Sequence, residues 1–222
     1  MILERERAEL VEYARRLRPD GLCVGTAGNL SLRHDRLVAI TPSTINYDVY
    51  APELMCVVDL DGNRVEAPLL PSSELPMHLA VYRASAAQAI VHAHPPYATL
   101  VSTIATDLPG IHYAIATLGG RVRVAPYARY GTPELAAAAV AGLEGRMAVL
   151  LQNHGSLTIG GTLREAYERA ALLEWLCQLY YRASLHGGAH LLSDDELAAV
   201  GASMAAQTEL VRARFAPPPR ED

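Results

Sequence analysis

Two histidines separated by one residue, His92 and His94, follow a short apolar run, and their imidazoles are suited to binding a metal ion. The run at 89–91 predicts a strand, and side chains two residues apart on a strand point to the same face. Two neutral imidazoles on one face can bind a single metal ion. Pro95 and Pro96 stop the strand, because proline cannot donate to a β-ladder. We therefore expect the pair at a strand end, where a ligand can approach.

A third histidine, His154, follows a second apolar run at 147–151, so it is also expected at a strand end. Glu74 closes a Pro-Ser-Ser-Glu turn with the features of a helix start, where an acid is favoured. Catalytic zinc typically takes three protein ligands and keeps one position open. The sequence thus predicts a site for zinc, or for another divalent metal, with the ligands His92, His94 and His154. Glu74 is either a fourth ligand of the empty site or a base beside the metal.

The remaining histidines and the cysteines are not expected to bind this metal. His78 lies one helical turn after Glu74, but the pair does not form a His-Glu-x-x-His motif, so we interpret His78 as a packing or supporting residue. The other histidines, which lack comparable neighbours, are His34, His112, His186 and His190. The cysteines are odd in number and scattered along the chain: Cys23, Cys56 and Cys177. This pattern indicates free thiols in a reducing cytoplasm rather than a thiolate zinc site.

Three segments rich in glycine or hydroxyl groups lie at 25–29, 41–44 and 71–74. The first is typical of a glycine-rich hairpin; the alternative is a nest of backbone N–H groups for an anion, with Asn29 as an added donor. It matches neither the Walker nor the Rossmann fingerprint. The serines of the third segment can simply cap a helix. On spacing alone, we favour these structural roles.

Composition and charge limit the class of protein. The chain has 222 residues, 50% hydrophobic and 19% charged, which favours a single packed domain at 1–215. The proline-rich end, 216–222, is expected to be disordered. A net charge of −5 without a basic stripe argues against nucleic acid as a partner. No apolar stretch is long enough to span a membrane and the acidic start does not resemble a signal peptide, so we expect a cytoplasmic protein with no membrane contact.

The elements that position the candidate residues alternate along the chain. Apolar runs and alternation predict strands at 30–33, 37–40, 55–60, 89–91, 122–125, 147–151 and 157–159. Helical spacing and capping residues predict helices at 2–17, 72–84, 97–104, 132–143, 163–186 and from 193 onward. Thr132 is the expected N-cap of the fourth helix, with Pro133 at the first helical position.

Several motifs, in this order, resemble the class II aldolases of the fuculose-1-phosphate aldolase type, within the aldolase and ribulose-5-phosphate 4-epimerase superfamily. The resemblance runs from about Gly21 to about Val200. The motifs are Gly25-Thr26-Ala27-Gly28-Asn29, Thr41-Pro42-Ser43-Thr44, Pro71-Ser72-Ser73-Glu74, His92-Ala93-His94, Ile111-His112-Tyr113, Ala125-Pro126-Tyr127 and Gln152-Asn153-His154-Gly155.

This resemblance implies an α/β fold with a central, mostly antiparallel sheet flanked by helices on both sides, the class II aldolase/adducin-like fold. It implies a homotetramer with active sites at subunit interfaces, and zinc on the three histidines, with Glu74 completing the shell when no substrate is bound. It changes our interpretation of the glycine and serine turns, which become one phosphate cradle made of Gly28, Asn29, Ser43, Thr44, Ser72 and Ser73. Tyr113 would reach a neighbouring subunit's site and give a proton to the aldehyde oxygen.

The implied reaction is the reversible cleavage of a ketose 1-phosphate to dihydroxyacetone phosphate and an aldehyde, such as lactaldehyde or a shorter or deoxy analogue. Zinc would stabilise the enediolate as a Lewis acid, and Glu74 would act as the base. The chain contains no lysine, which excludes the Schiff-base chemistry of class I aldolases. The open alternatives are a sugar-phosphate 4-epimerase, a dehydratase or decarboxylase on the same scaffold, and a non-catalytic metal-binding assembly. Epimerases tend to carry Asp at the position of Glu74.

The chain departs from the family pattern at two places. Thr44 stands where these aldolases commonly have glycine, so a side chain lies where close backbone approach is usual. The C-terminal segment has Phe215 and prolines rather than an evident tyrosine. The identity of the aldehyde stays open.

Overall fold

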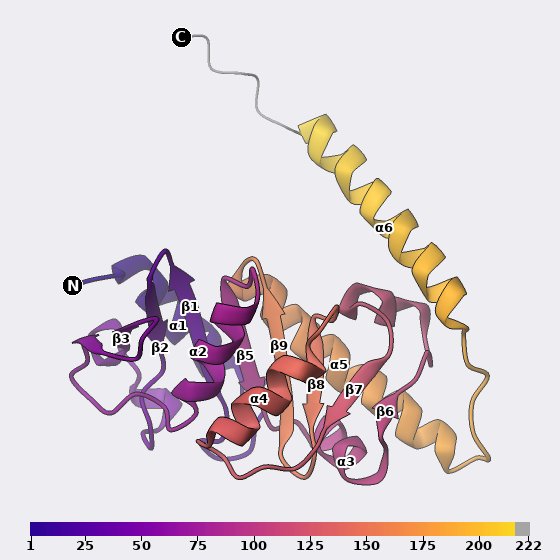
Figure 1. The fold of residues 1–222 in the computed structure, drawn as a ribbon, viewed down its shortest axis with the longest axis horizontal. Coiled ribbons are helices and arrows are strands. Elements are labelled where there is room, and N and C mark those ends of the chain that lie inside the picture. The colour runs from indigo at the N-terminus through magenta and orange to yellow at the C-terminus, as the bar shows by residue number, and fades with distance from the viewer. Residues whose placement is uncertain (216–222) are drawn as a thin grey trace.

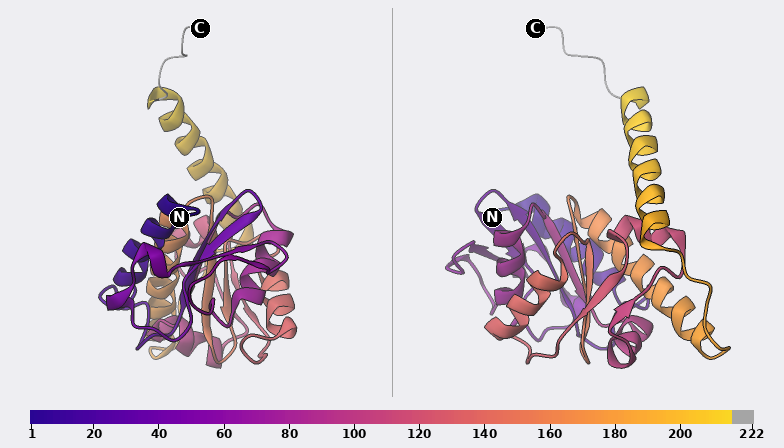
Figure 2. Two further views of the ribbon diagram at one scale, coloured as in Figure 1. Left: turned by 90° about the vertical axis from the view of Figure 1, so that its left-hand side faces the viewer. Right: turned by 45° about the vertical axis from the view of Figure 1, so that its right-hand side comes forward.

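The structure is a computed structural model that describes residues 1–215 of the chain. The end predicted to be disordered, 216–222, lies outside the described residues. One nine-stranded sheet runs through the described part, with helices on both of its faces (Figures 1 and 2).

The sheet is mixed but mostly antiparallel, as expected, with one parallel pair within the described residues. Its strands are β1 (Asn29–His34), β2 (Leu37–Ile40), β3 (Cys56–Asp59), β4 (Arg64–Glu66), β5 (Ala89–Ala93), β6 (Asp107–Leu108), β7 (Val122–Ala125), β8 (Ala148–Leu151) and β9 (Gly155–Gly160). They lie in the order β4-β3-β2-β1-β5-β9-β8-β7-β6. β7 and β8 run parallel beside antiparallel pairs, because a helix carries the chain from the end of β7 back to the start of β8.

Different helices cover the two faces of the sheet. On one face, α1 (Glu4–Arg16), α3 (Pro96–Ile104) and α5 (Leu163–Ser184) cover the sheet. On the other face lie α2 (Leu75–Ala84) and α4 (Pro133–Gly142), which pack against each other. Short 3₁₀ helices lie between strands: η1 (Tyr47–Val49) and η2 (Pro52–Leu54) between β2 and β3, and η3 (Tyr113–Leu118) between β6 and β7. The last helix, α6 (Asp194–Phe215), packs through Leu197 at its start and then leaves the body (Figure 1).

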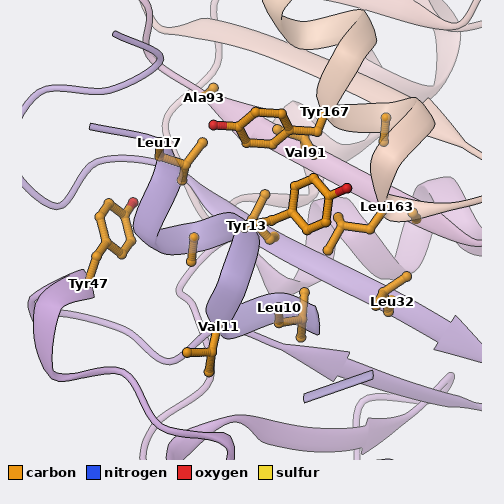
Figure 3. Close-up of a cluster of buried hydrophobic side chains, with 14 of the residues drawn as sticks. Leu10, Val11, Tyr13, Leu17, Leu32, Tyr47, Val91, Ala93, Leu163 and Tyr167 are labelled. Carbon is orange, nitrogen blue, oxygen red and sulfur yellow. The ribbon is translucent and has the colours of Figure 1, made fainter. Parts of the chain in front are cut away.

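Strand alternation divides the core between the faces. Leu30 and Leu32 of β1 point toward α1 and α5, where Tyr13 and Tyr167 meet edge to face with ring centroids 5.1 Å apart (Figure 3). Full burial of side chains of this size contributes roughly 1.5–3 kcal/mol each. The packed face holds β1 and β5 in fixed register, so polar side chains on the opposite face of these strands are placed accurately.

Most predicted elements exist within a few residues of their expected bounds. The N-cap prediction is confirmed, because the Thr132 side chain accepts a hydrogen bond from Leu135 N. The helix expected from 72 begins later, at Leu75, and its N-cap residue Glu74 makes no side-chain cap bond. The sequence prediction missed β4, β6 and η3, which are short. Within the described residues, no helix is both long and apolar enough to cross a membrane.

Candidate active site and metal centre

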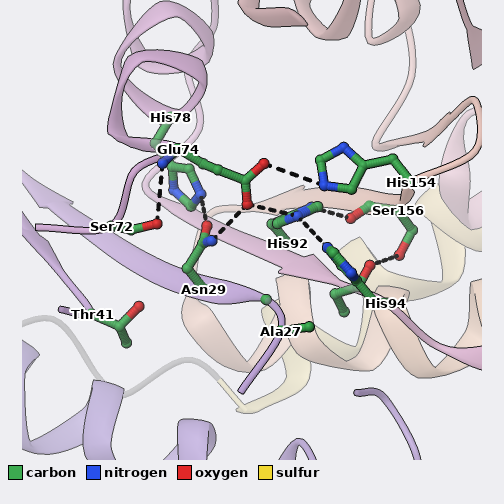
Figure 4. A network of polar contacts seen from close by, with 12 residues as sticks. Ala27, Asn29, Thr41, Ser72, Glu74, His78, His92, His94, His154 and Ser156 are labelled. Atoms are coloured by element: carbon green, nitrogen blue, oxygen red, sulfur yellow. Dashed lines mark hydrogen bonds and ion pairs between the residues drawn. The ribbon is translucent and has the colours of Figure 1, made fainter. Parts of the chain in front are cut away.

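Glu74, His92, His94 and His154 converge, with one ligand atom of each lying within 4.8 Å of all the others (Figure 4). The carboxylate of Glu74 bridges the group: its Oε2 lies 2.9 Å from His92 Nε2, and its Oε1 lies 3.4 Å from His154 Nε2. Nε2 of His94 lies 2.9 Å from Nε2 of His92. Glu74 and His92 are buried, whereas His94 and His154 are partly exposed, so the group opens to solvent on the histidine side.

Local backbone structure explains how these side chains meet. β5 ends at Ala93, and the His94 N–H donates to Leu22 O, which holds that histidine just beyond the strand. His154 lies in the tight turn between β8 and β9, after Asn153, which adopts a left-handed φ of 55° that asparagine tolerates. Gly155 is required here, since a Cβ would lie 2.4 Å from Ala93 O. The turn can therefore close directly over the end of β5.

Hydrogen bonding determines which nitrogen His92 offers, and burial determines the charge of the other two imidazoles. Nδ1 of His92 lies 2.9 Å from Ser156 O, so it carries the proton and leaves the Nε2 lone pair facing Glu74. Burial lowers the pKa of His94 to about 3 and that of His154 to about 4, which keeps both imidazoles neutral at neutral pH. Burial opposes ionisation of Glu74, but His92 and His154 outweigh it and hold the pKa of that carboxyl below its usual range.

The four residues fit a divalent metal. Oε1 of Glu74 is buried without a hydrogen-bond donor among the described residues, and lone pairs of neutral imidazoles face the same space. Burial lowers the pKa of His92, but the adjacent Glu74 outweighs it and raises that pKa, so the space between them favours positive charge. Three imidazole nitrogens with one carboxylate form a donor set suited to zinc.

The three glycine and hydroxyl turns lie side by side next to this group. The Leu30 N–H donates to Thr41 Oγ1, which joins the first turn to the second. The Ser43 N–H donates to Leu70 O and the Ser72 N–H to Thr41 O, which joins the second turn to the third. The family resemblance predicted that the turns form one cradle, but not which hydrogen bonds join them.

Three residues of these turns have a left-handed backbone, Gly25, Gly28 and Thr44, and the last two bear on the site. Gly28 has φ 98°, and a Cβ there would lie 2.7 Å from His92 O, so glycine is required beside the metal centre. Thr44 has φ 62°, a conformation that is strained for a β-branched residue. A glycine at this position would have no such strain.

Residues 8–181 match the family model described as the class II aldolase and adducin N-terminal domain. The chain belongs to this family. It is 41% identical, over 89% of its length and 94% of the relative, to the 5-deoxy-D-ribulose 1-phosphate aldolase of Bacillus thuringiensis serovar kurstaki. It is 39% identical to the L-fuculose phosphate aldolase of Escherichia coli strain K12, over 81% of this chain and 85% of that one.

Solved structures agree with the family assignment. An L-fuculose 1-phosphate aldolase superposes with a TM-score of 0.88 at 40% identity, covering 90% of this chain and 96% of the other. The resemblance seen in the sequence motifs is therefore confirmed, and the chain is a class II aldolase, a lyase.

In this class II aldolase, Tyr113 is not one of the four clustered residues. It begins η3, has 53% of its surface exposed, and its ring stacks on His112, which in turn contacts Trp175 of α5. Its predicted role in a neighbouring subunit's site stays a prediction, and its exposure is compatible with that role.

Sequence reasoning missed three side chains or groups that support the site. Ser156 contributes only its carbonyl to His92, which no sequence pattern reveals. Ser31 and Tyr82 are buried and linked to the site through His78, which itself is completely buried. The alternation of Asn29 and Ser31 with leucines was a usable signal, because it places two polar side chains on one face of β1.

Proposed function

We propose that this class II aldolase reversibly cleaves a ketose 1-phosphate to dihydroxyacetone phosphate and an aldehyde. His92, His94 and His154 would bind zinc, with Glu74 as a further ligand when no substrate is bound. The observation that carries the proposal is the buried Glu74 carboxylate, which faces three imidazoles and has one oxygen without a donor among the described residues. Relatives named for fuculose phosphate and for 5-deoxyribulose phosphate both support a ketose 1-phosphate as the substrate class.

The residues of the chain divide the work of the reaction. When bound, the metal ion supplies Lewis-acid stabilisation of the negative charge that develops during carbon–carbon cleavage. Oε1 of Glu74 is suited to hold the proton that moves to and from the carbon of the dihydroxyacetone phosphate half, because it has no other hydrogen to accept. Tyr113 of a neighbouring subunit takes the hydroxyl proton of the aldehyde half during cleavage.

Phosphate binding falls to the three joined turns. The backbone N–H groups of Ser43 and Ser72 are already bonded to Leu70 O and Thr41 O, so these residues offer their hydroxyls. Gly28, Thr44 and Ser73 offer backbone N–H groups, the last two also offer hydroxyls, and Asn29 can add one hydrogen of its amide. Positioning the phosphate in this way fixes the distance from the reacting carbons to Glu74, which is how binding energy lowers the barrier. The strained Thr44 lies in this cradle, where related aldolases commonly have glycine, so the fit of the phosphate is expected to differ from theirs at this residue.

The assembly and the compartment follow from the same proposal. A homotetramer would bring Tyr113, exposed in a single chain, into the site of the next subunit. The three cysteines are buried and unpaired, which supports a reducing cytoplasm as the compartment.

A retro-aldol assay on a panel of ketose 1-phosphates tests the proposal. The panel contains L-fuculose 1-phosphate, 5-deoxyribulose 1-phosphate and ribulose 1-phosphate, and the product measured is dihydroxyacetone phosphate. We expect cleavage of at least one sugar, its loss on chelation, and its recovery with zinc. Metal-loaded protein that releases no dihydroxyacetone phosphate from any of them, or that instead epimerises ribulose 5-phosphate, would refute the proposal.

A further inference from the structure

A buried chain of hydrogen bonds runs from α2 through β1 to the metal centre. The Tyr82 hydroxyl lies 2.7 Å from Ser31 Oγ, and Ser31 Oγ lies 2.6 Å from His78 Nδ1. Nε2 of the same histidine lies 2.6 Å from Asn29 Oδ1, and Asn29 Nδ2 donates to Glu74 Oε2 over 2.9 Å (Figure 4). All five side chains are buried.

The spacing of side chains along α2 matches the spacing along β1, which makes this series of hydrogen bonds possible. Asn29 and Ser31 are two residues apart on β1, a spacing of about 6.8 Å on one strand face. His78 and Tyr82 are four residues apart on α2, a spacing of about 6 Å on one helix face. The two pairs therefore lie opposite each other, and the polar groups interleave rather than meeting apolar neighbours.

The direction of every hydrogen bond in this series follows from the carboxylate of Glu74 at its end. An ionised Glu74 only accepts, so Asn29 must present its NH₂ group there and its carbonyl to His78. The carbonyl only accepts, so His78 donates through Nε2–H. His78 is completely buried and neither ring nitrogen is bonded to a carboxylate, so the ring is neutral and its Nδ1 accepts from the Ser31 hydroxyl. Ser31 in turn accepts from the Tyr82 hydroxyl.

We propose that His78, supported by Ser31 and Tyr82, is a positioning residue that fixes the amide orientation of Asn29 and thereby anchors Oε2 of Glu74. Without the Nε2–H donor, the buried carbonyl of Asn29 has lost its partner, so the amide can rotate away and loosen its bond to Oε2 of Glu74. With the donor, Oε2 stays held by Asn29, and Oε1 remains the oxygen without a donor among the described residues. The two oxygens of the Glu74 carboxylate thus have different roles: Oε2 is held by Asn29, and Oε1 is left to accept the proton in the reaction. The role of His78 in turnover rests on the proposed aldolase function.

Substitutions at His78 distinguish positioning from packing. His78→Leu fills the space but cannot donate, whereas His78→Gln places an amide N–H close to the position of Nε2. We expect His78→Leu to lower kcat for retro-aldol cleavage about tenfold, as supporting residues of metal sites commonly do, with a smaller change in KM. His78→Gln should recover most of the loss. His190→Gln, at an exposed histidine, is the matched control.

A spectroscopic measurement tests the same idea without turnover. In protein labelled with ¹⁵N-histidine, His78 is assigned by its absence from the His78→Gln spectrum, and we expect the Nε2–H tautomer with a bare Nδ1. Ser31→Ala and Tyr82→Phe should shift the Nδ1 signal, and zinc affinity should fall in His78→Leu. An Nδ1–H tautomer, or equal kcat in His78→Leu and wild type, or equal kcat in the Leu and Gln variants, would overturn the inference.

The outcomes separate the inference from the proposed function. A wild-type protein that cleaves no ketose 1-phosphate removes the aldolase proposal, while the tautomer and the zinc affinity still decide whether His78 orients Asn29. If His78→Leu does not fold, the wild-type tautomer and its response to Tyr82→Phe, which keeps the ring, decide the question. Active wild type with the wrong tautomer removes only the inference.

Discussion

Oε2 of Glu74 lies 2.9 Å from Nε2 of His92, so the residue directly before α2 touches the C-terminal end of strand β5. The contact depends on the packing of α2 over that strand, because neither residue is near the other in the chain. His92 is also the strand-pairing partner of Asn29, whose amide donates to the same oxygen. The carboxylate is therefore held between a helix start and two paired strands.

Removal of one histidine ligand should remove the metal. We expect purified protein to contain close to one zinc per chain and His94→Ala to lose it, because two imidazoles and a carboxylate bind more weakly than the full set. Chelation should also lower the melting temperature, since metal at 100 times its Kd contributes about 2.7 kcal/mol. Metal analysis and thermal unfolding check this, with exposed His190→Ala as the control. Full metal content in the alanine variants of His92, His94 and His154 alike would contradict the assignment.

Glu74→Gln should keep the fold but lose turnover. The amide retains the shape and can still contact Asn29, but it cannot take a proton. General acid–base groups contribute about 10²–10⁴-fold, so we expect a loss of that order in kcat. Steady-state kinetics with circular dichroism checks this, and Glu168→Gln on the exposed side of α5 is the control. A rate near wild type would leave Glu74 with only a structural role.

Thr44→Gly should not reduce stability, which is unusual for a change to glycine. The left-handed backbone costs a non-glycine residue about 1–2 kcal/mol, and relief of this strain offsets the entropy that glycine loses on folding. Thr103→Gly, at an exposed position in the last turn of α3, should instead destabilise by a few tenths of a kcal/mol. Urea unfolding compares the two, and equal destabilisation would show that Thr44 is unstrained. In the assay, Thr44→Gly should lower KM for the sugar phosphate by opening the cradle.

Tyr113→Phe should separate two steps of the reaction. The change removes one hydroxyl from an exposed ring, so the fold should be unaffected. Carbon–carbon cleavage should slow strongly, whereas exchange of the carbon-bound proton of dihydroxyacetone phosphate, which needs no aldehyde, should change much less. Deuterium exchange followed by NMR beside a cleavage assay measures both, with Tyr180→Phe as the control. Equal loss of both activities would make Tyr113 a general support of the site, and loss of neither would remove it from the mechanism.

The three thiols should be unreactive in the folded protein at pH 8. Burial raises the pKa of Cys23, Cys56 and Cys177, so the reactive thiolate is scarce below that raised pKa, and its fraction grows only as pH climbs toward it. Titration with a chromogenic disulfide should give slow labelling in buffer and three fast equivalents in denaturant. Rapid labelling of a native thiol would show that its segment opens in solution.

Much of the site was predictable from local patterns. His-x-His after an apolar run, a histidine before glycine at a second strand end, and an acid at a helix start indicate metal ligands because their spacing alone places them at element ends. The motif order sufficed for the family, which the comparisons confirm. The element types followed from periodicity, whereas short strands such as β4 and β6 carry too few residues to show it.

Tertiary structure decided the features that depend on pairs far apart in the chain. The parallel pairing of β7 with β8, the joining of the three turns through Thr41 and Ser72, and the burial of Ser31 against His78 are not encoded in any single segment. A strand pattern shows that Asn29 and Ser31 share a face, but not whether that face meets water or a helix. Packing of α2 on β1 settles this. It excludes water from those side chains, so their polar groups must form hydrogen bonds with one another.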